Sequence, residues 1–190
     1  MHYISISEGM PRLDTMPVLK TTEYPWEEGS FKPLCYARIA VVKGEGVVFD
    51  LTAFERDPEC CDFVMDGSCV ALTFDFFPER SNEALTIALN KRGGYDVFLS
   101  GEPIKLSLDV ETYAGEDEQG WYWGVRFIIT NEILERLYGV SEIENGHTMY
   151  GNIYKLKLTG SDSHLGAISR IKDEVIFAFG NLCEFTAVSY

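Results

Sequence analysis

SCVALTFDFF, residues 68–77, is the most regular stretch of this chain. Its side chains form two alternating sets: Val70, Leu72, Phe74 and Phe76 in one, and Cys69, Ala71, Thr73 and Asp75 in the other. Successive side chains of a β-strand point to opposite faces, so a period of two with one apolar set predicts a strand. We expect this strand to lie in the centre of a sheet.

Similar short segments occur on both sides of it. Residues 36–42, 47–54, 85–90, 95–99, 104–113, 121–129, 150–158, 175–179 and 183–188 are predicted as further strands because β-branched and aromatic residues concentrate there. Glycine turns follow the first and third of these, at Gly44–Gly46 and Gly93-Gly94, and an acidic loop, residues 114–120, precedes the WYW motif. Turns of this kind predict antiparallel hairpins.

One short helix is predicted at residues 131–138, because Thr130 can cap its start and Gly139 can end it. Many short strands with one short helix predict an all-β fold. We expect a two-sheet antiparallel β-sandwich, immunoglobulin-like or jelly-roll-like. A closed barrel is the alternative, because the same alternation would serve it.

The first 35 residues differ from the rest of the chain. They contain four of the seven prolines (Pro11, Pro17, Pro25 and Pro33) and show little periodicity. We expect an extended N-terminal segment, residues 1–35, packed on a single β-sandwich domain, residues 36–190. The total of 190 residues is typical of one domain.

Charge narrows the choice of partner. Sixteen basic and thirty acidic residues give a net charge of −14, which repels nucleic acid and anionic membranes. Sugars and cations remain compatible with such a surface. No segment has the pattern of a leader or the ~20 apolar residues of a membrane span. We therefore expect a soluble cytoplasmic protein, or a secreted one if a leader has been removed.

The cysteines and histidines lack the spacing of a zinc site. Cys60 and Cys61 are adjacent, and the three remaining cysteines are scattered, so we expect reduced structural thiols. Calcium suits the chain better, because acidic residues gather in the segments 57–66 and 116–118 and offer hard oxygen ligands. We therefore expect that the protein requires no cofactor and that calcium is a possible ligand.

The motif WYW, residues 121–123, supplies the first candidates for ligand binding. A flat aromatic face can stack on a sugar ring. Alternation places Trp121 and Trp123 on one face of a strand and Tyr122 on the other. Both indoles could instead fill the core, and this remains the alternative interpretation. Trp121 and Tyr122 are our aromatic candidates.

Several segments, in this order, resemble the family 9-like carbohydrate-binding modules. They are YARIA (36–40) with GEG (44–46), DGSCV (66–70), LN (89–90), WGVRF (123–127) with the short helix, and GNIYK (151–155) with HLG (164–166). The resemblance extends from about residue 36 to residue 171. It implies a β-sandwich in which tryptophan faces hold a sugar and polar side chains fix it, with calcium in some members.

The chain departs from this resemblance near its end. Similar sequences carry a tryptophan where this chain has Ile168, and a proline where it has Arg170. A cysteine often stands at the position of Leu156. If the missing tryptophan is the sugar platform of the relatives, Trp121, Trp26 or Tyr122 would have to replace it.

Polar candidates come from the matching segments. Arg38, Asn90, Asn152, Lys155 and His164 could bind sugar hydroxyls. Three of them also have a structural interpretation: an ion pair for Arg38, a turn for Asn152 and a solvated side chain for Lys155.

These observations favour a non-catalytic carbohydrate-binding module with a carbohydrate partner. The first alternative is a protein-interaction or assembly module that has lost sugar binding, which Ile168 favours. The second is a glycan-processing enzyme, which would need converging carboxylates. Asp75 is the one carboxylate worth inspecting, and alternation favours a solvent-facing position for it. We expect neither a nucleic-acid partner nor a membrane partner.

Overall fold

The computed structural model describes residues 1–26, 32 and 34–189. In these residues thirteen strands form one sheet, and one α-helix follows the tenth strand. The strands are β1 His2–Ser7, β2 Leu19–Lys20, β3 Cys35–Val42, β4 Gly46–Ala53, β5 Cys69–Asp75, β6 Leu85–Leu89, β7 Tyr95–Leu99, β8 Glu102–Pro103, β9 Val110–Asp117, β10 Gly120–Thr130, β11 Thr148–Lys157, β12 His164–Ala167 and β13 Cys183–Val188, and the helix is α1 Asn131–Tyr138.

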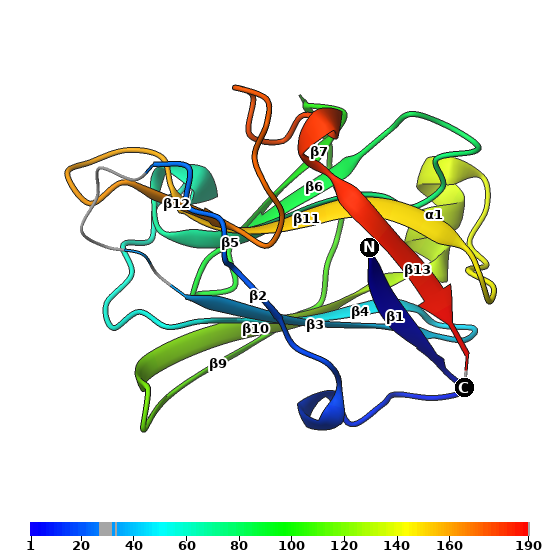
Figure 1. Cartoon of the computed structure of the whole chain (residues 1–190), viewed down its shortest axis with the longest axis horizontal. Helices are drawn as coiled ribbons and strands as arrows, with labels where there is room; N and C mark the ends of the chain where they lie inside the picture. The colour runs from blue at the N-terminus through cyan, green and yellow to red at the C-terminus, as the bar shows by residue number, and fades with distance from the viewer. Residues whose placement is uncertain (27–31, 33, 190) are drawn as a thin grey trace.

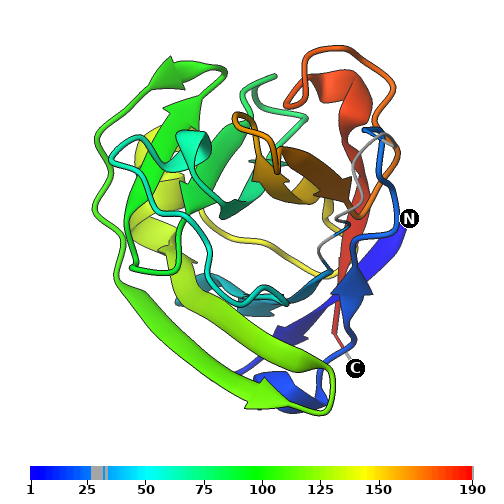
Figure 2. The ribbon, with the colours of Figure 1, turned by 90° about the vertical axis from the view of Figure 1, so that its left-hand side faces the viewer.

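The strand order is β8-β7-β6-β5-β11-β13-β1-β3-β4-β10-β9, with β12 beside β11 and β2 beside β3. β1 runs parallel to both β13 and β3. Figure 1 shows one half of the sheet, with β5, β6, β7 and β11, lying over the other half, with β3, β4, β9 and β10. β13 and β1 connect the two halves, and Figure 2 shows the sheet curling around the space between them.

The all-β prediction is confirmed, but the expected pair of separate antiparallel sheets is replaced by one curled, mixed sheet. The physical reason is β1, which pairs through both of its edges and so joins the halves. Regular structure therefore begins at His2, well before residue 36. The division into residues 1–35 and 36–190 stays a prediction.

The sheet does not close into the alternative barrel. The main path of paired strands ends at β8 and β9, and the segment 104–109 links these two ends across the open side. Leu106 and Leu108 of this segment are buried, and the Tyr95 hydroxyl donates to the Leu106 carbonyl (3.3 Å) and accepts from the Leu108 N–H (3.1 Å). The strand predicted from residue 104 therefore begins only at Val110, and it continues to Asp117 through most of the predicted acidic loop.

Aromatic rings fill the core between the two halves. The ring of Phe49 lies 5.4 Å from that of Phe127 in a stacked arrangement and 5.4 Å from that of Phe74 in an edge-on arrangement. Such offset and edge-on pairs are the favoured geometries of aromatic rings. Phe74 lies on β5, which pairs with β6 and β11, so the predicted central position of this strand is confirmed.

Local signals predicted the helix and the first hairpin correctly. The Thr130 hydroxyl accepts from the Ile133 N–H at 3.3 Å, and Gly139 ends α1 with φ 68°. Gly44, with φ 77°, occupies the turn between β3 and β4.

The strand predicted at residues 175–179 is wrong. These residues form a loop that runs into a short 3-10 turn, Phe179–Asn181. The buried Asn181 side chain holds the loop, because its Oδ1 accepts from the Lys172 and Asp173 N–H groups and its Nδ2 donates to the Val175 carbonyl. Hydrogen bonds from the Asn181 side chain thus replace the backbone hydrogen bonds that a β-strand would make with its neighbour.

The outer face of β5 and β6 is also covered. Ala71, Ala88 and Tyr154 form a second apolar cluster with Leu165 of β12, and Phe177 packs against it. The five cysteines are free thiols, and burial raises the pKa of Cys35 and Cys69 to about 12. Among the described residues no helix is long and apolar enough to span a membrane.

Candidate functional site

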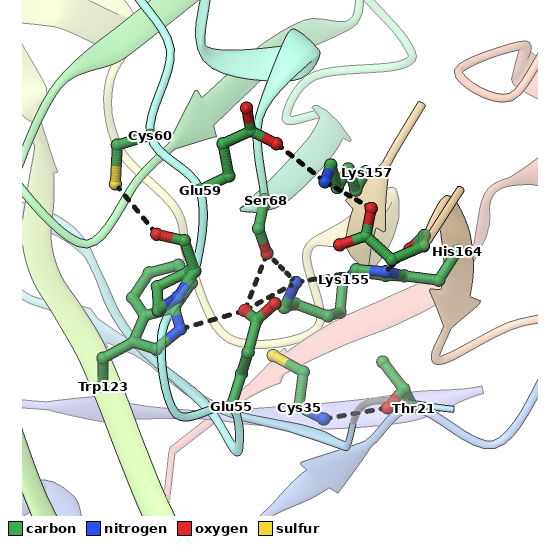
Figure 3. A network of polar contacts seen from close by, with 12 residues as sticks. Thr21, Cys35, Glu55, Glu59, Cys60, Ser68, Trp123, Lys155, Lys157 and His164 are labelled. Carbon is green, nitrogen blue, oxygen red and sulfur yellow. Dashed lines mark hydrogen bonds and ion pairs between the residues drawn. The ribbon is translucent and has the colours of Figure 1, made fainter. Parts of the chain in front are cut away.

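Three places in the structure are candidates for a functional site, and two of them contain predicted ligand residues. The first is a buried polar network at one end of the core, shown in Figure 3. Nζ of Lys155 donates to Ser68 Oγ (2.5 Å), lies 2.8 Å from His164 Nε2 and pairs with Glu55 Oε2 at 3.2 Å. Glu55 also accepts from Ser68 Oγ (2.7 Å) and Trp123 Nε1 (3.3 Å).

Protonation in this network follows from its geometry. The Lys155 ammonium can only donate, so Nε2 of His164 must accept, and its Nδ1–H donates to the Asp162 carbonyl at 2.9 Å. Burial and the charge of Lys155 lower the pKa of His164 to about 4. Burial alone would raise the pKa of Glu55, but the charge of Lys155 and the hydrogen bonds from Ser68, Lys155 and Trp123 together outweigh it, so the net shift of the Glu55 pKa is downward. Burial lowers the pKa of Lys155, whereas the negative charge of Glu55 raises it, and the net shift of the Lys155 pKa is downward.

The network joins the two halves of the sheet. Lys155 belongs to β11 in one half and Trp123 to β10 in the other, while Glu55 follows β4. The Lys155 side chain is fully buried, and its three donor hydrogens have three partners. Lys155 and His164 therefore present no open surface to a ligand in this structure.

The two candidate asparagines are buried as well. Asn90 Oδ1 accepts from the N–H groups of Arg92 and Gly94 and shapes the turn before β7. Asn152 Nδ2 donates to the carbonyls of Asn181 (2.8 Å) and Ser169 (3.2 Å). Both amides thus hold the backbone together.

The two indoles of the WYW motif differ. Trp123 is fully buried in the core, as the alternative interpretation expects. Trp121 is 45% exposed, and the guanidinium of Arg56 lies 5.5 Å from its ring centroid. Trp26, another of the three proposed substitute platforms, is exposed too.

A second place is an open apolar groove that we call the phenylalanine groove, defined by Phe63, Phe98, Phe177 and Phe179. Its volume is about 480 Å³. Phe63 is 46% exposed and Phe179 is 44% exposed, although they come from distant parts of the chain. Asn82, Thr86 and Ser100 add polar groups to the lining.

Fixed contacts position the walls of this groove. Asp96 Oδ2 accepts from the Val64 N–H at 2.7 Å, which holds the turn after Phe63. On the other side, the ring of Phe177 packs edge-on against Tyr154 at 5.2 Å, beside the loop that Asn181 clamps. The sequence analysis names none of these phenylalanines as a ligand residue. For Phe177 and Phe179 the reason is the incorrect prediction of a strand at residues 175–179.

The third place is a groove on the outer face of β3, β4, β9 and β10, which brings together two predicted residues, Arg38 and Tyr122. We call it the tyrosine–arginine groove and define it by Tyr36, Arg38, Asp50, Phe54, Tyr113, Tyr122 and Arg126. Its volume is about 350 Å³. Trp121 lines neither this groove nor the phenylalanine groove.

Neither acidic loop gathers into a metal cluster in the part of the chain that the structure describes, where no three His, Cys, Asp or Glu side chains are grouped to hold an ion. Calcium binding stays a prediction. Asp75 is fully buried, so the expected solvent-facing position is wrong; the face of β5 that carries it is itself covered. Burial raises the pKa of Asp75 to about 6.

Comparison with solved structures identifies the same fold in carbohydrate-binding proteins. A proposed carbohydrate-binding protein from Bacteroides uniformis superposes with a TM-score of 0.74 at 16% sequence identity, covering 98% of this chain and 99% of that one. A family 9 carbohydrate-binding module from Caldicellulosiruptor kristjanssonii in complex with cellotriose gives 0.67 at 9% identity, covering 100% and 94%. Its complex with glucose gives 0.66 at 9% identity, covering 99% and 96%.

No family model and no curated protein sequence matches the chain. At these identities the structural likeness establishes the fold. The resemblance to family 9-like modules is therefore confirmed in the architecture of the chain.

Proposed function

We propose that this chain is a non-catalytic carbohydrate-binding module that holds a saccharide in the phenylalanine groove. The observation that carries the proposal is the pair of exposed rings, Phe63 and Phe179, which line one groove from segments far apart in the sequence.

The chemistry of the groove supports a sugar ligand. Aromatic faces cover the C–H surface of a pyranose, and the side chains of Asn82 and Ser100 offer hydrogen bonds to its hydroxyls. The groove falls within the range of about 300–1,000 Å³ that is usual for small-molecule sites. Because the walls are already fixed by Asp96 and Tyr154, little ordering entropy is lost on binding.

The shared fold supports the same function. The module from Caldicellulosiruptor kristjanssonii carries cellotriose or glucose, so neutral glucosides are the first ligands to try. In the family that the sequence resembles, tryptophan faces hold the sugar. In this chain Ile168 is buried, and we propose that phenylalanines take over the platform.

Isothermal titration with glucose and cellotriose tests the proposal. Phe63→Ala and Phe179→Ala should each weaken cellotriose binding about 5-fold, since an aromatic contact of this kind contributes on the order of 1 kcal/mol. Trp121→Ala is the matched control, because Trp121 is equally exposed but lies outside the groove. It should leave the affinity unchanged.

Two results would contradict the proposal. One is unchanged affinity in both phenylalanine variants; the other is loss of binding in Trp121→Ala with a normal melting temperature. The second result would move the sugar to the WYW motif.

A protein-interaction module is the second candidate, and Val175 favours it. This side chain is 68% exposed beside the phenylalanine groove and enlarges its apolar surface. Exposed apolar patches often mark protein contacts. If none of a full set of neutral glycans binds the protein, the protein-interaction module is favoured over the carbohydrate-binding module.

A further inference from the structure

The tyrosine–arginine groove lies on the other half of the sheet from the phenylalanine groove. Its side chains come from the outward positions of neighbouring strands: Arg38 on β3, Asp50 on β4 and Arg126 on β10. These three residues are direct partners across the ladders, since Asp50 is opposite Arg38 on one side and opposite Arg126 on the other. The sheet thus places one carboxylate between two guanidiniums.

The polar groups of the floor do not saturate one another. Asp50 is buried, and its Oδ1 accepts from the Tyr113 hydroxyl at 2.7 Å. Arg38 Nη1 is 3.8 Å from Asp50 Oδ2 and Arg126 Nε is 3.7 Å from Oδ1, which are ion-pair distances beyond a normal hydrogen bond. The Nε atoms of both arginines are buried and have no hydrogen-bond partner among the described residues. A buried donor without a partner is costly, so this floor favours a ligand that accepts hydrogen bonds.

Aromatic rings form the wall beside this floor. The ring of Phe54 lies 4.9 Å from Tyr36 and 6.1 Å from Tyr122. These rings pack on the outer face of the sheet, away from the core cluster that Phe49 and Phe127 occupy. The groove therefore combines flat apolar surface with unsaturated donors and an acceptor.

Charge defines the class of ligand. The lining carries the cations Arg38 and Arg126 and the anions Asp14, Asp50 and Asp117, so three negative charges outweigh two positive ones. The net charge of the whole chain is −14, and this negative charge disfavours an anionic ligand such as a uronic acid or a phosphate. The two guanidiniums on the floor disfavour a cation. A neutral polyhydroxyl compound fits, because its hydroxyl oxygens accept from arginine and its hydroxyl hydrogens donate to Asp50.

We infer that the tyrosine–arginine groove is a second saccharide site, which takes a neutral sugar through two adjacent hydroxyls held by Arg38, Asp50 and Arg126 and stacks it against Tyr122. It is chemically distinct from the phenylalanine groove and does not depend on it. With one site on each half of the sheet, the module can hold two sugar chains, or two points of one chain.

Amide NMR titration of the full chain with glucose and cellotriose tests this inference. We expect two separate groups of shifting resonances, one around Phe63 and Ser100 and one around Tyr122 and Arg126. Tyr122→Ala and Arg38→Lys should each abolish or weaken the second group at least 10-fold and leave the first group unchanged. Arg38→Lys keeps the charge, so it tests the hydrogen bonds of the guanidinium alone.

Phe63→Ala is the reciprocal variant and should remove only the first group of shifts. Glucuronic acid should bind at the second group at least 10-fold more weakly than glucose. Absence of shifts near Tyr122 at saturating sugar overturns the second site and leaves the first intact. A glucuronic acid affinity equal to or above that of glucose overturns the ligand class. Melting temperatures of the variants show whether each remains folded.

Discussion

Lys155 and Glu55 form a charged pair that the fold encloses almost completely. Removing one charge from a buried pair typically costs about 3–5 kcal/mol, because the partner is left unpaired, whereas replacing both by apolar side chains is often nearly neutral. We therefore expect Lys155→Met to destabilise the protein by about 3–5 kcal/mol and Glu55→Leu combined with Lys155→Met to recover most of that loss.

Urea denaturation of the two variants measures this. The Lys43–Glu8 pair is the control, because both side chains are exposed and Lys43→Met should cost less than about 1 kcal/mol. Equal losses in the Lys155→Met and Lys43→Met variants would show that the buried network adds nothing beyond a surface pair.

His164 gives stability a pH dependence. Its pKa falls from 6.5 in the unfolded chain to about 4 in the folded one, so protons bind the unfolded state preferentially between these values. The contribution of this neutral histidine is complete above pH 6.5 and is lost as the pH falls toward 4. From pH 7 to pH 5 we expect a loss of about 1–2 kcal/mol from this group.

Asp75 acts in the opposite direction. Its pKa rises from 3.8 to about 6, so its protonated form favours the folded state as the pH falls through this range. The contribution of His164 is therefore obtained by comparing a His164→Gln variant with the wild type, because Asp75 affects both proteins equally. In urea denaturation at pH 7, 6 and 5, the variant should lose less stability than the wild type as the pH falls. Parallel pH profiles of the two proteins would rule out the assigned shift.

At the scale of single elements, the turn from β7 to β8 carries backbone strain. Ser100 has φ 51° and Gly101 has φ 87°, a two-residue turn in which both positions favour glycine. We expect Ser100→Gly to stabilise the protein by about 0.5–1 kcal/mol and Gly101→Ala to destabilise it by about 1 kcal/mol, because only glycine adopts this region without strain. Thermal melts without ligand measure both, and destabilisation by Ser100→Gly would contradict the assigned strain.

Elements with local signals were predictable from the sequence. The β3–β4 hairpin follows from Gly44, and α1 follows from Thr130 and Gly139, because the chemistry of each lies within a few residues. The loop before Phe179 was not predictable, since it depends on Asn181, whose side chain replaces backbone pairing. Its apolar run resembles a strand, and this error hid one wall of the phenylalanine groove.

The candidate sites were also only partly predictable, because local patterns can be recognised in the sequence whereas contacts between distant segments cannot. Alternation along β10 correctly separated Tyr122, on the outer face, from Trp123 in the core. It could not distinguish Trp121 from Trp123, because exposure at the end of a strand depends on which segments cover it. Nor could it show that Lys155 is enclosed, since its partners Glu55 and Ser68 lie far away in the sequence.

At the scale of the whole molecule, β1 determines the shape. Its parallel pairs with β13 and β3 join segments from both ends of the chain, and no local pattern in residues 2–7 announces such long-range partners. These pairs join two halves that the sequence predicts as separate antiparallel sheets, and a smaller backbone link, from Thr22 and Glu23 to Ala167 of β12, connects the halves as well. The curl shown in Figure 2, and the opposite placement of the two grooves, depend on this strand.

Two neighbouring side chains of β1 allow a direct test. Ile4 is buried in the core between the halves, while Tyr3, next to it, points to solvent. Truncating a buried isoleucine leaves a cavity, so we expect Ile4→Ala to cost about 2–4 kcal/mol and Tyr3→Ala less than about 0.5 kcal/mol. Urea denaturation, followed by tryptophan fluorescence of the buried Trp123, measures both. Because β1 joins the halves, Ile4→Ala should also speed amide hydrogen exchange in both β13 and β3. Faster exchange in β1 alone would mean that β1 does not hold the two halves together.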